Sequence, residues 1–310
     1  MSTPLVSVVL ITSGCPWLGE AISSVLAQSM TDFELIVVDG TAGGDLDLSA
    51  WPDPRIRVIK VPWSGVAVAR NAGNAVARAP YIAVIDHDDR WLPTKLERQL
   101  PHLEASPDVG MCHAQYRTID ALGLVTGPGF TAPAAPLTDL LARRLVFVMH
   151  STTLWRRTVV EKVGGYDPRF ILAEDFDLFL KVLRTSKIVL EPSVQVEYRW
   201  HSANLSHSHE VQYASLQATL RQHLPALVAQ ASMTGLTRKQ SFAVERSLRA
   251  AYRAAYFVLI WDATVDAARA HQFGSAIGHG VFAARMHPML VARLLAKWGW
   301  HRLGDLLHGS

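Results

Sequence analysis

The chain has 310 residues, a formal net charge of +3 at pH 7, 49% hydrophobic residues and 18% charged residues. This composition is typical of a globular protein with a sizeable core, and it excludes an intrinsically disordered chain. No uncharged apolar run reaches the ~18 residues of a spanning helix and no basic segment follows the first residue, so we expect a cytoplasmic protein without a membrane anchor.

Strand-like and helix-like segments alternate along the N-terminal part of the chain. The predicted elements, in chain order, are strand Val6–Thr12, a helix with an apolar stripe from Trp17 to Leu26, strand Phe33–Asp39, strand Arg55–Val61, helix Val66–Arg78 and strand Tyr81–Ile85. Strands that alternate with helices form sheets covered on both faces. This order therefore predicts a three-layer α/β/α domain around a largely parallel sheet.

The pattern is looser from residue 106 onwards. The predicted elements here are strands Val109–Tyr116 and Val146–Trp155, a loop over Gly127–Pro136 and a helix over Asp175–Leu183. Strand signals end near residue 211, and helical segments rich in Ala, Leu and Arg follow. We therefore divide the chain into an α/β domain over residues 1–207 and a helical C-terminal region over residues 208–310.

Three carboxylates directly follow the last strand of the first series, at Asp86, Asp88 and Asp89. Like charges this close raise one another's pKa unless a cation lies among them. In an extended strand, Asp86 and Asp88 project to one side and His87 points away. Two carboxylates on one side suit Mg²⁺ or Mn²⁺ held together with a substrate's phosphates. The alternative is an Asp-rich turn that caps a helix.

Two carboxylates end separate strands of the predicted sheet. Asp39 is the last residue of one strand, and Asp86 directly follows another. Ligands of open α/β sheets bind in the crevice beyond the carboxyl ends of the strands. The convergence of both residues on one edge therefore predicts a ligand site there.

The sequence argues against several other kinds of site. Cys15 and Cys112 lack metal-site spacing, so we expect free thiols. Gly40–Gly44 lacks the Gly-Lys-Ser/Thr ending of a phosphate-binding P-loop. Residues 206–310 hold 11 Lys and Arg against 5 Asp and Glu, but no groove-reading or base-reading motif accompanies this charge. We therefore expect no nucleic-acid partner.

Several segments share the order and spacing of the motifs of a known family. They are Val6–Thr12, Ala21–Gln28, Glu34–Thr41, Ala69–Asn74 followed by Ala79–Ile82 and the acidic cluster, and Gly164–Asp167 followed by Glu174–Leu178. On these segments the chain resembles the family-2 glycosyltransferases of GT-A fold. The resemblance implies an inverting enzyme that moves a sugar from a nucleotide-diphosphate donor to a hydroxyl of a glycan or lipid-linked acceptor. Bacterial surface or exopolysaccharide synthesis is the implied setting.

The resemblance also implies a role for each donor-site residue. Asp39 would accept an N–H of the base, and Thr12 would help to line the base pocket. Asp86 would contact the ribose, and Asp88 would coordinate the Mn²⁺ or Mg²⁺ that holds both phosphates. A metal in that position stabilises the negative charge of the leaving diphosphate.

Asp175 is the general base that the resemblance implies. Inversion by single displacement needs a carboxylate within hydrogen-bond reach of the acceptor hydroxyl. The alternative is that Glu174 and Asp175 only begin a helix, where acidic residues suit the N-terminal dipole.

Arg70 and His201 each have more than one interpretation. Arg70 pairs with a donor phosphate or with one of the carboxylates, or it lies on a solvated helix face. His201 belongs to a segment similar to one that, in some relatives, places a histidine near the metal or the diphosphate. A simple loop histidine is the alternative.

The chain departs from the family pattern at the end of its second strand. Relatives commonly carry two acids where this chain has Asp39 and Gly40, and an aromatic residue and Asn where it has Ser13 and Gly14. Because Asp39 is present, we expect the missing second acid to change which nucleobase is selected more than it changes catalysis. A UDP-sugar is the favoured donor, and another nucleotide is the alternative.

The C-terminal residues intersperse apolar and aromatic side chains with Lys and Arg over residues 282–306. A helix with one apolar and one basic side can lie in a membrane interface, which would bring the enzyme to a lipid-linked acceptor. The alternatives are that these helices pack on the catalytic domain or form a homodimer.

Two other functions compete with sugar transfer. A non-catalytic scaffold would keep a nucleotide-sugar pocket without turnover, but the presence of both Asp88 and Asp175 argues against it. A sugar-phosphate nucleotidyltransferase would carry a basic residue in the loop after the first strand, and Thr12–Pro16 has none.

Overall fold

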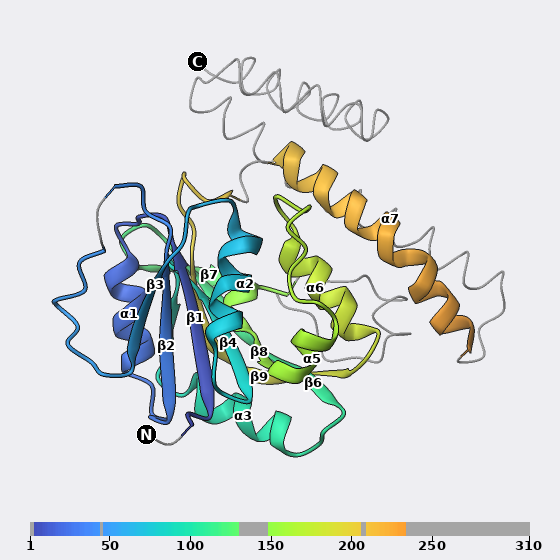
Figure 1. The fold of residues 1–310 in the computed structure, drawn as a ribbon, viewed down its shortest axis with the longest axis horizontal. Helices are drawn as coiled ribbons and strands as arrows, with labels where there is room; N and C mark the ends of the chain where they lie inside the picture. Colours follow the sequence, from blue (N-terminus) through green and yellow to red (C-terminus); the bar gives the residue numbers. More distant parts are fainter. Residues whose placement is uncertain (1–2, 44–45, 130–147, 206–208, 234–310) are drawn as a thin grey trace, which may run out of the picture.

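The computed structural model describes residues 3–43, 46–129, 148–205 and 209–233 (Figure 1). The strands are β1 (Val6–Thr12), β2 (Phe33–Asp39), β3 (Ile56–Lys60), β4 (Tyr81–Asp86), β5 (Arg90–Trp91), β6 (Val109–Ile119), β7 (Val125–Pro128), β8 (Leu154–Arg156) and β9 (Lys187–Arg199). The helices are α1 (Leu18–Leu26), α2 (Val66–Val76), α3 (Lys95–Glu104), η1 (His150–Thr152), α5 (Arg157–Lys162), α6 (Glu174–Leu183) and α7 (His209–Met233).

The strands form one mixed sheet. Its order within the described residues is β3-β2-β1-β4-β8-β6-β9-β5, and β7 pairs with β6. Strands β1 to β4 are parallel, with Thr12 opposite Asp39 and Ile11 opposite Asp86. β8 is antiparallel to both β4 and β6. The largely parallel sheet predicted from the sequence is therefore correct for β1 to β4, whereas the remaining strands are mixed.

Helices cover both faces of the parallel strands (Figure 1). Leu18, Ile22 and Val25 of α1 pack on one face, against the residues of β1 and β2 that point to that side. Ala69 of α2 packs on the other face with Val9 and its neighbours. Because successive side chains of a strand point to opposite faces, a strand covered on both sides is apolar throughout. This confirms the predicted three-layer arrangement.

Gly73 lets α2 lie close to the sheet. A Cβ at this position would lie 2.5 Å from Val9 Cγ1 and 3.0 Å from Val38 Cγ2. Both valines are fully buried. The absence of a side chain at Gly73 therefore sets the distance between helix and sheet, and with it the position of Arg70 one turn earlier.

Gly73→Ala is expected to lower the free energy of unfolding by about 1–3 kcal/mol, because the added methyl group overpacks a filled core. The gain in helix propensity on replacing Gly is smaller than this cost. Urea unfolding measures the change. Gly127→Ala is the control, because a Cβ there would meet only Thr118 Oγ1, at 3.6 Å. Equal unfolding midpoints for the two variants would contradict the close packing.

The strand predicted over Val146–Trp155 is wrong for most of its described part. His150–Thr152 form a 3₁₀ helix, and only Leu154–Arg156 pair as β8. The hydroxyl groups of Thr152 and Thr153 donate to carbonyl oxygens three residues earlier, at 2.6 and 2.7 Å. Such local hydrogen bonds compete with strand pairing.

The long strand β9 was not predicted from the sequence. It contains Pro192, which cannot donate to a ladder, and it pairs with β6 through several register shifts. The loop predicted over Gly127–Pro136 starts inside β7 and otherwise lies mainly outside the described residues.

A buried cluster of polar and charged side chains joins α7 to α6, and the two helices lie side by side (Figure 1). His223 Nε2 lies 2.6 Å from Asp177 Oδ1, and Lys181 Nζ lies 2.6 Å from Asp177 Oδ2. Leu216 and Leu220 of α7 are buried as well. The described part of the C-terminal region therefore packs on the α/β domain. The predicted boundary at residue 207 stays a prediction.

Replacing His223 by Ala is expected to lower the free energy of unfolding by about 1.5–3 kcal/mol. The reason is that a hydrogen bond to a buried carboxylate is lost and Asp177 keeps only Lys181 as a charged partner. Urea unfolding of the full chain measures the effect. Gln222→Ala, at an exposed neighbouring position, should change little. Equal stability of both variants would show that this cluster does not hold α7 in place.

No helix in the described ranges is both long and apolar enough to cross a membrane. The amphipathic helices predicted over residues 282–306 lie outside the described residues.

Candidate active site

A pocket of about 470 Å³ opens at the carboxyl ends of β1 and β4. Its walls come from the loop after β1, the start of α2, the end of β4, η1, the start of α6, the end of β9 and the residues after it, and the start of α7. Seven segments, most of them distant in sequence, therefore contribute to one site. This is the sheet edge at which the sequence predicted a ligand site.

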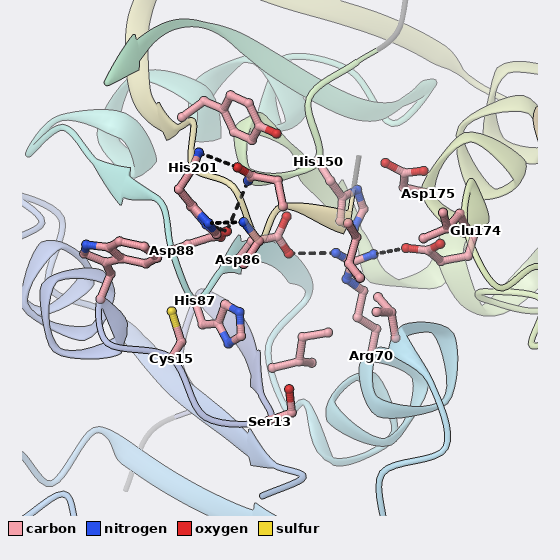
Figure 2. Close-up of a pocket in the computed structure, with 18 of the residues that line it drawn as sticks. Ser13, Cys15, Arg70, Asp86, His87, Asp88, His150, Glu174, Asp175 and His201 are labelled. Atoms are coloured by element: carbon pink, nitrogen blue, oxygen red, sulfur yellow. Dashed lines mark hydrogen bonds and ion pairs between the residues drawn. The ribbon is translucent and has the colours of Figure 1, made fainter. Parts of the chain in front are cut away.

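A buried arginine joins two walls of the pocket (Figure 2). Arg70 Nη2 lies 2.7 Å from Asp86 Oδ1, and Arg70 Nη1 lies 2.5 Å from Glu174 Oε1. Arg70 is 4% exposed, which excludes the solvated helix face as its environment. Among the interpretations left open by the sequence, the structure supports pairing with carboxylates. The partner Glu174 was not predicted.

The charges of this bridge stabilise one another. Burial alone would lower the pKa of Arg70, but the carboxylates of Asp86 and Glu174 outweigh burial and raise it. Burial alone would raise the pKa of Asp86, but the charge of Arg70 outweighs burial and lowers it. Arg70 therefore stays charged, and Asp86 stays ionised. The bridge fixes the end of β4 relative to the start of α6.

Asp175 faces the pocket next to this bridge without joining it (Figure 2). Its carboxylate accepts the N–H of Phe176 at 2.7 Å. Burial, followed by the charge of Glu174, raises the pKa of Asp175 to about 7 against the opposite effect of Arg70. A carboxylate with a pKa near neutrality is well suited to accept a proton from a hydroxyl group.

The backbone before Asp175 is strained. Ala173 has φ +70°, and among the described residues it is the one non-glycine position with positive φ. A left-handed backbone at a residue with a Cβ is uncommon and often found at functional sites. This turn starts α6 so that Glu174 and Asp175 reach the pocket from its first turn.

Asp88 and His201 converge on the opposite side of the site (Figure 2). His201 Nε2 lies 3.0 Å from Asp88 Oδ2, and the ring of His201 lies against Trp17 with centroids 4.4 Å apart. Asn204 accepts the backbone N–H of His201 at 2.6 Å, which holds the loop in place. His201 is therefore not a free loop histidine. Trp17 and Asn204 were not predicted as site residues.

The donor set at Asp88 fits a divalent cation that is completed by substrate. Within the described ranges, no group of three or more His, Cys, Asp or Glu residues could hold a metal by itself. Mg²⁺ and Mn²⁺ are usually bound by one or two protein groups together with substrate phosphates. Asp88 supplies a carboxylate for that pattern, and the imidazole of His201, 3.0 Å from it, is a second nitrogen donor beside the same position.

The prediction that His87 points away from the site is wrong. β4 ends at Asp86, so the strict alternation of a strand no longer applies to the next residue. His87 lines the pocket together with Asp88, and its Nδ1 lies 3.1 Å from Thr12 Oγ1.

Thr12 and Asp39 lie beneath the pocket and are not part of its lining. Thr12 is fully buried, and its Oγ1 accepts the N–H of Gly14 at 3.1 Å. Asp39 is 1% exposed and accepts the N–H and the hydroxyl of Thr41 at 2.9 and 2.6 Å. Burial alone would raise the pKa of Asp39, but the hydrogen bonds of Thr41 outweigh it and lower the pKa. Both residues fix the loops that carry the pocket.

Asp89, the third carboxylate of the acidic cluster, does not face the pocket. It is fully buried and accepts the hydroxyl of Ser151 at 2.5 Å and the N–H of Arg199 at 3.0 Å. Arg199 in turn donates to the carbonyl oxygen of Asp88 at 2.9 Å and to Glu20 at 2.6 Å. These contacts join β4 to β9 and hold the backbone of Asp88.

His150 is a further pocket residue that was not predicted. It is buried, and its Nε2 lies 2.8 Å from the hydroxyl oxygen of Tyr166. Burial, followed by the charge of Arg70, holds the pKa of His150 well below its usual range. It is therefore neutral near pH 7. Its position in the pocket depends on tertiary packing, so no local pattern marked it.

A comparison of sequences identifies the family of the chain. The model of the family described as glycosyl transferase family 2 matches residues 7–164. A protein described as an uncharacterized glycosyltransferase from Rickettsia prowazekii is 27% identical over 214 residues, which are 66% of this chain and 67% of the relative. The chondroitin synthase of Pasteurella multocida is 25% identical over 191 residues, which are 59% of this chain and 19% of the synthase.

Solved structures share the fold. TarS of S. aureus (residues 1–349), solved in complex with UDP-GlcNAc, matches with a TM-score of 0.61 at 12% identity over 91% of each chain. The mannosyltransferase PcManGT of Pyrobaculum calidifontis, solved with GDP-Man and Mn²⁺, matches with a TM-score of 0.57 at 17% identity, covering 97% of this chain and 81% of the other. The fold is thus the GT-A fold that the resemblance implied. With half of its length matched by the family model, the chain belongs to glycosyl transferase family 2 and is a glycosyltransferase.

Proposed function

We propose that this enzyme transfers a sugar, with inversion, from a nucleotide-diphosphate donor to a hydroxyl group of a glycan or lipid-linked acceptor. The observation that carries the proposal is the placement of Asp88 and Asp175 on different walls of one pocket, joined through the Asp86–Arg70–Glu174 bridge. A diphosphate held at Asp88 and a hydroxyl near Asp175 would then meet on opposite faces of the transferred sugar.

The chemistry follows from the two carboxylates. The acceptor oxygen forms a bond to the anomeric carbon while the bond from that carbon to the diphosphate oxygen breaks, and Asp175 takes the proton of the hydroxyl group. Asp88 and His201 would hold Mn²⁺ or Mg²⁺, which stabilises the charge of the leaving diphosphate. Two contacts keep the end of β4 in position. His87 contacts Thr12, and Arg70 pairs with Asp86.

The nature of the donor is supported by the relatives. TarS binds UDP-GlcNAc and UDP in its solved complexes, and PcManGT binds GDP-Man with Mn²⁺. We favour a UDP-sugar, with Asp39 and Thr12 organising the base end of the site from below. The named relatives include chondroitin and hyaluronan synthases, which is consistent with a glycan acceptor and with polysaccharide synthesis.

Product analysis tests this proposal. The full chain is incubated with Mn²⁺, a panel of UDP-, GDP- and dTDP-sugars and glycan acceptors, and the released nucleotide is identified. Release of nucleoside diphosphate that is lost in Asp175→Asn supports the proposal, and the coupling constant of the new anomeric proton reports inversion. Release of pyrophosphate would instead indicate a nucleotidyltransferase. If the donor binds but is neither transferred to any acceptor nor hydrolysed by water, the protein is a scaffold.

A further inference from the structure

Trp63 occupies the space beside Gly40, where relatives commonly carry a second acid. A Cβ at Gly40 would lie 2.5 Å from Trp63 Cε3 and 3.4 Å from the carbonyl oxygen of Thr12. The N–H of Gly40 donates to that same oxygen at 2.8 Å, so the backbone cannot easily move away. The indole therefore packs directly on the glycine backbone, and an acid at this position would displace it.

Trp63 also forms part of the pocket wall. Its side chain is 43% exposed although the indole packs on the backbone of Gly40. The pocket residues at the end of β1, directly after it and at the start of α2 are uncharged, namely Ile11, Ser13, Gly14 and Val66. Arg70 lies one turn further along α2, but its guanidinium group is directed to Asp86 and Glu174. The pocket therefore has one uncharged aromatic end and one charged end.

Asp39 has little capacity left to accept hydrogen bonds from a ligand at the aromatic end. It is absent from the lining, and its Oδ1 already accepts two hydrogen bonds from Thr41. Its Oδ2 lies 3.8 Å from Lys60 Nζ. A flat ligand group that enters this end therefore meets the indole of Trp63, which lines the pocket, whereas the carboxylate of Asp39 does not line it.

The two ends of the pocket are spaced for a nucleotide. Gly40 follows β2 and Asp86–Asp88 follow β4, with β1 between the two strands. Two interstrand spacings amount to roughly 10 Å, which leaves room for a ribose between a base and a diphosphate. We propose that Trp63 is the surface on which the nucleobase of the donor stacks, and that Gly40 is required to admit the indole. This inference rests on the proposed function.

Binding measurements on single variants test the role of Trp63. UDP, GDP, ADP and inorganic pyrophosphate are titrated, each with Mn²⁺, into the wild type, Trp63→Ala, Trp63→Phe and Gly40→Asp. Stacking on an aromatic side chain predicts that Trp63→Ala weakens nucleotide binding roughly 5- to 100-fold. Trp63→Phe should keep most of the affinity, and Gly40→Asp should weaken it as Trp63→Ala does. Pyrophosphate binding should stay unchanged in all three variants.

Trp51→Ala is the matched control, because Trp51 does not line the pocket and its indole N–H donates to Ser23 of α1. It should bind every probe as the wild type does. Nucleotide affinity unchanged in Trp63→Ala, with thermal unfolding of that variant showing a folded chain, would overturn the inference. An equal loss of affinity for nucleotide and for pyrophosphate in Trp63→Phe would overturn the inference as well. The proposed function fails if pyrophosphate binding does not depend on Asp88. The inference on Trp63 alone fails if pyrophosphate binding depends on Asp88 but nucleotide binding does not depend on Trp63.

Discussion

Asp175→Asn is expected to lower kcat about 10²–10⁴-fold while the donor still binds, because general base catalysis contributes an effect of that size. Asn keeps the shape of the side chain and can still accept the N–H of Phe176, so the start of α6 should be preserved. Steady-state kinetics and a direct donor titration measure the two properties separately. An equal loss of donor affinity would show that Asp175 binds the donor and would remove its role as base.

The pH dependence of the wild-type enzyme follows from the same group. Asp175 accepts a proton only when it is ionised, and its pKa is about 7. The rate of transfer should therefore rise with pH up to about 7 and then reach a plateau. A profile of kcat/KM that is already flat from about pH 5 would contradict this assignment.

The raised pKa of Asp175 also has a consequence for stability. Between pH values of about 4 and about 7, the folded chain keeps a proton on Asp175 that the unfolded chain has released. The contribution of this group to the free energy of unfolding therefore falls as pH rises through this window. Asp175→Asn removes that contribution, so the variant should gain Tm relative to the wild type from pH 5 to pH 8. Because the entropy of unfolding grows with chain length, each kcal/mol corresponds to roughly 1–2 °C in a chain of 310 residues.

Arg70→Met is expected to destabilise the protein by about 3–5 kcal/mol, because removing one partner of a buried ion pair leaves uncompensated charge. Two carboxylates, Asp86 and Glu174, would lose their shared cation at once. Part of the stability should return at low pH, where the stranded carboxylates become protonated. Urea unfolding at pH 5 and pH 8 measures both effects.

Arg169→Met is the matched control for this prediction. Arg169 pairs with Asp167 at 2.6 Å, but its side chain is 75% exposed. Exposed ion pairs contribute little to stability, so this variant should unfold like the wild type. Arg70→Lys keeps the charge, but a single ammonium group lacks the fork that reaches two carboxylates. If Arg70→Met unfolded like Arg169→Met, the bridge would not be a stabilising element.

The parallel strands could be predicted because their environment is uniform. Val6–Thr12 and Phe33–Asp39 are covered by helices on both faces, so they are mostly apolar and have the bounds predicted from the sequence. β9 has no such signature. Polar residues and Pro192 occur within it, and its pairing with β6 depends on register shifts that no local pattern encodes.

The candidate site divides in the same way. Asp86 and Asp88 could be found because they follow a recognisable strand, and Asp175 because it lies in a family motif. Their partners depend on contacts between distant segments. Glu20 and Arg199, for example, are 179 positions apart and meet only when β9 adds to the sheet. The glycine at position 40, where relatives commonly carry an acid, was visible in the sequence. Its contact with Trp63 was not.

Titration of UDP into the full chain, with and without Mn²⁺, tests the central claim most directly when it is repeated on Asp88→Ala and Asp175→Asn. If the two carboxylates serve the donor and the acceptor respectively, the wild type binds UDP tightly only with Mn²⁺. Asp88→Ala then loses the metal-dependent part, and Asp175→Asn keeps it. UDP binding that is independent of metal and equal in all three proteins would contradict the division of this pocket into a metal-diphosphate side and a catalytic-base side.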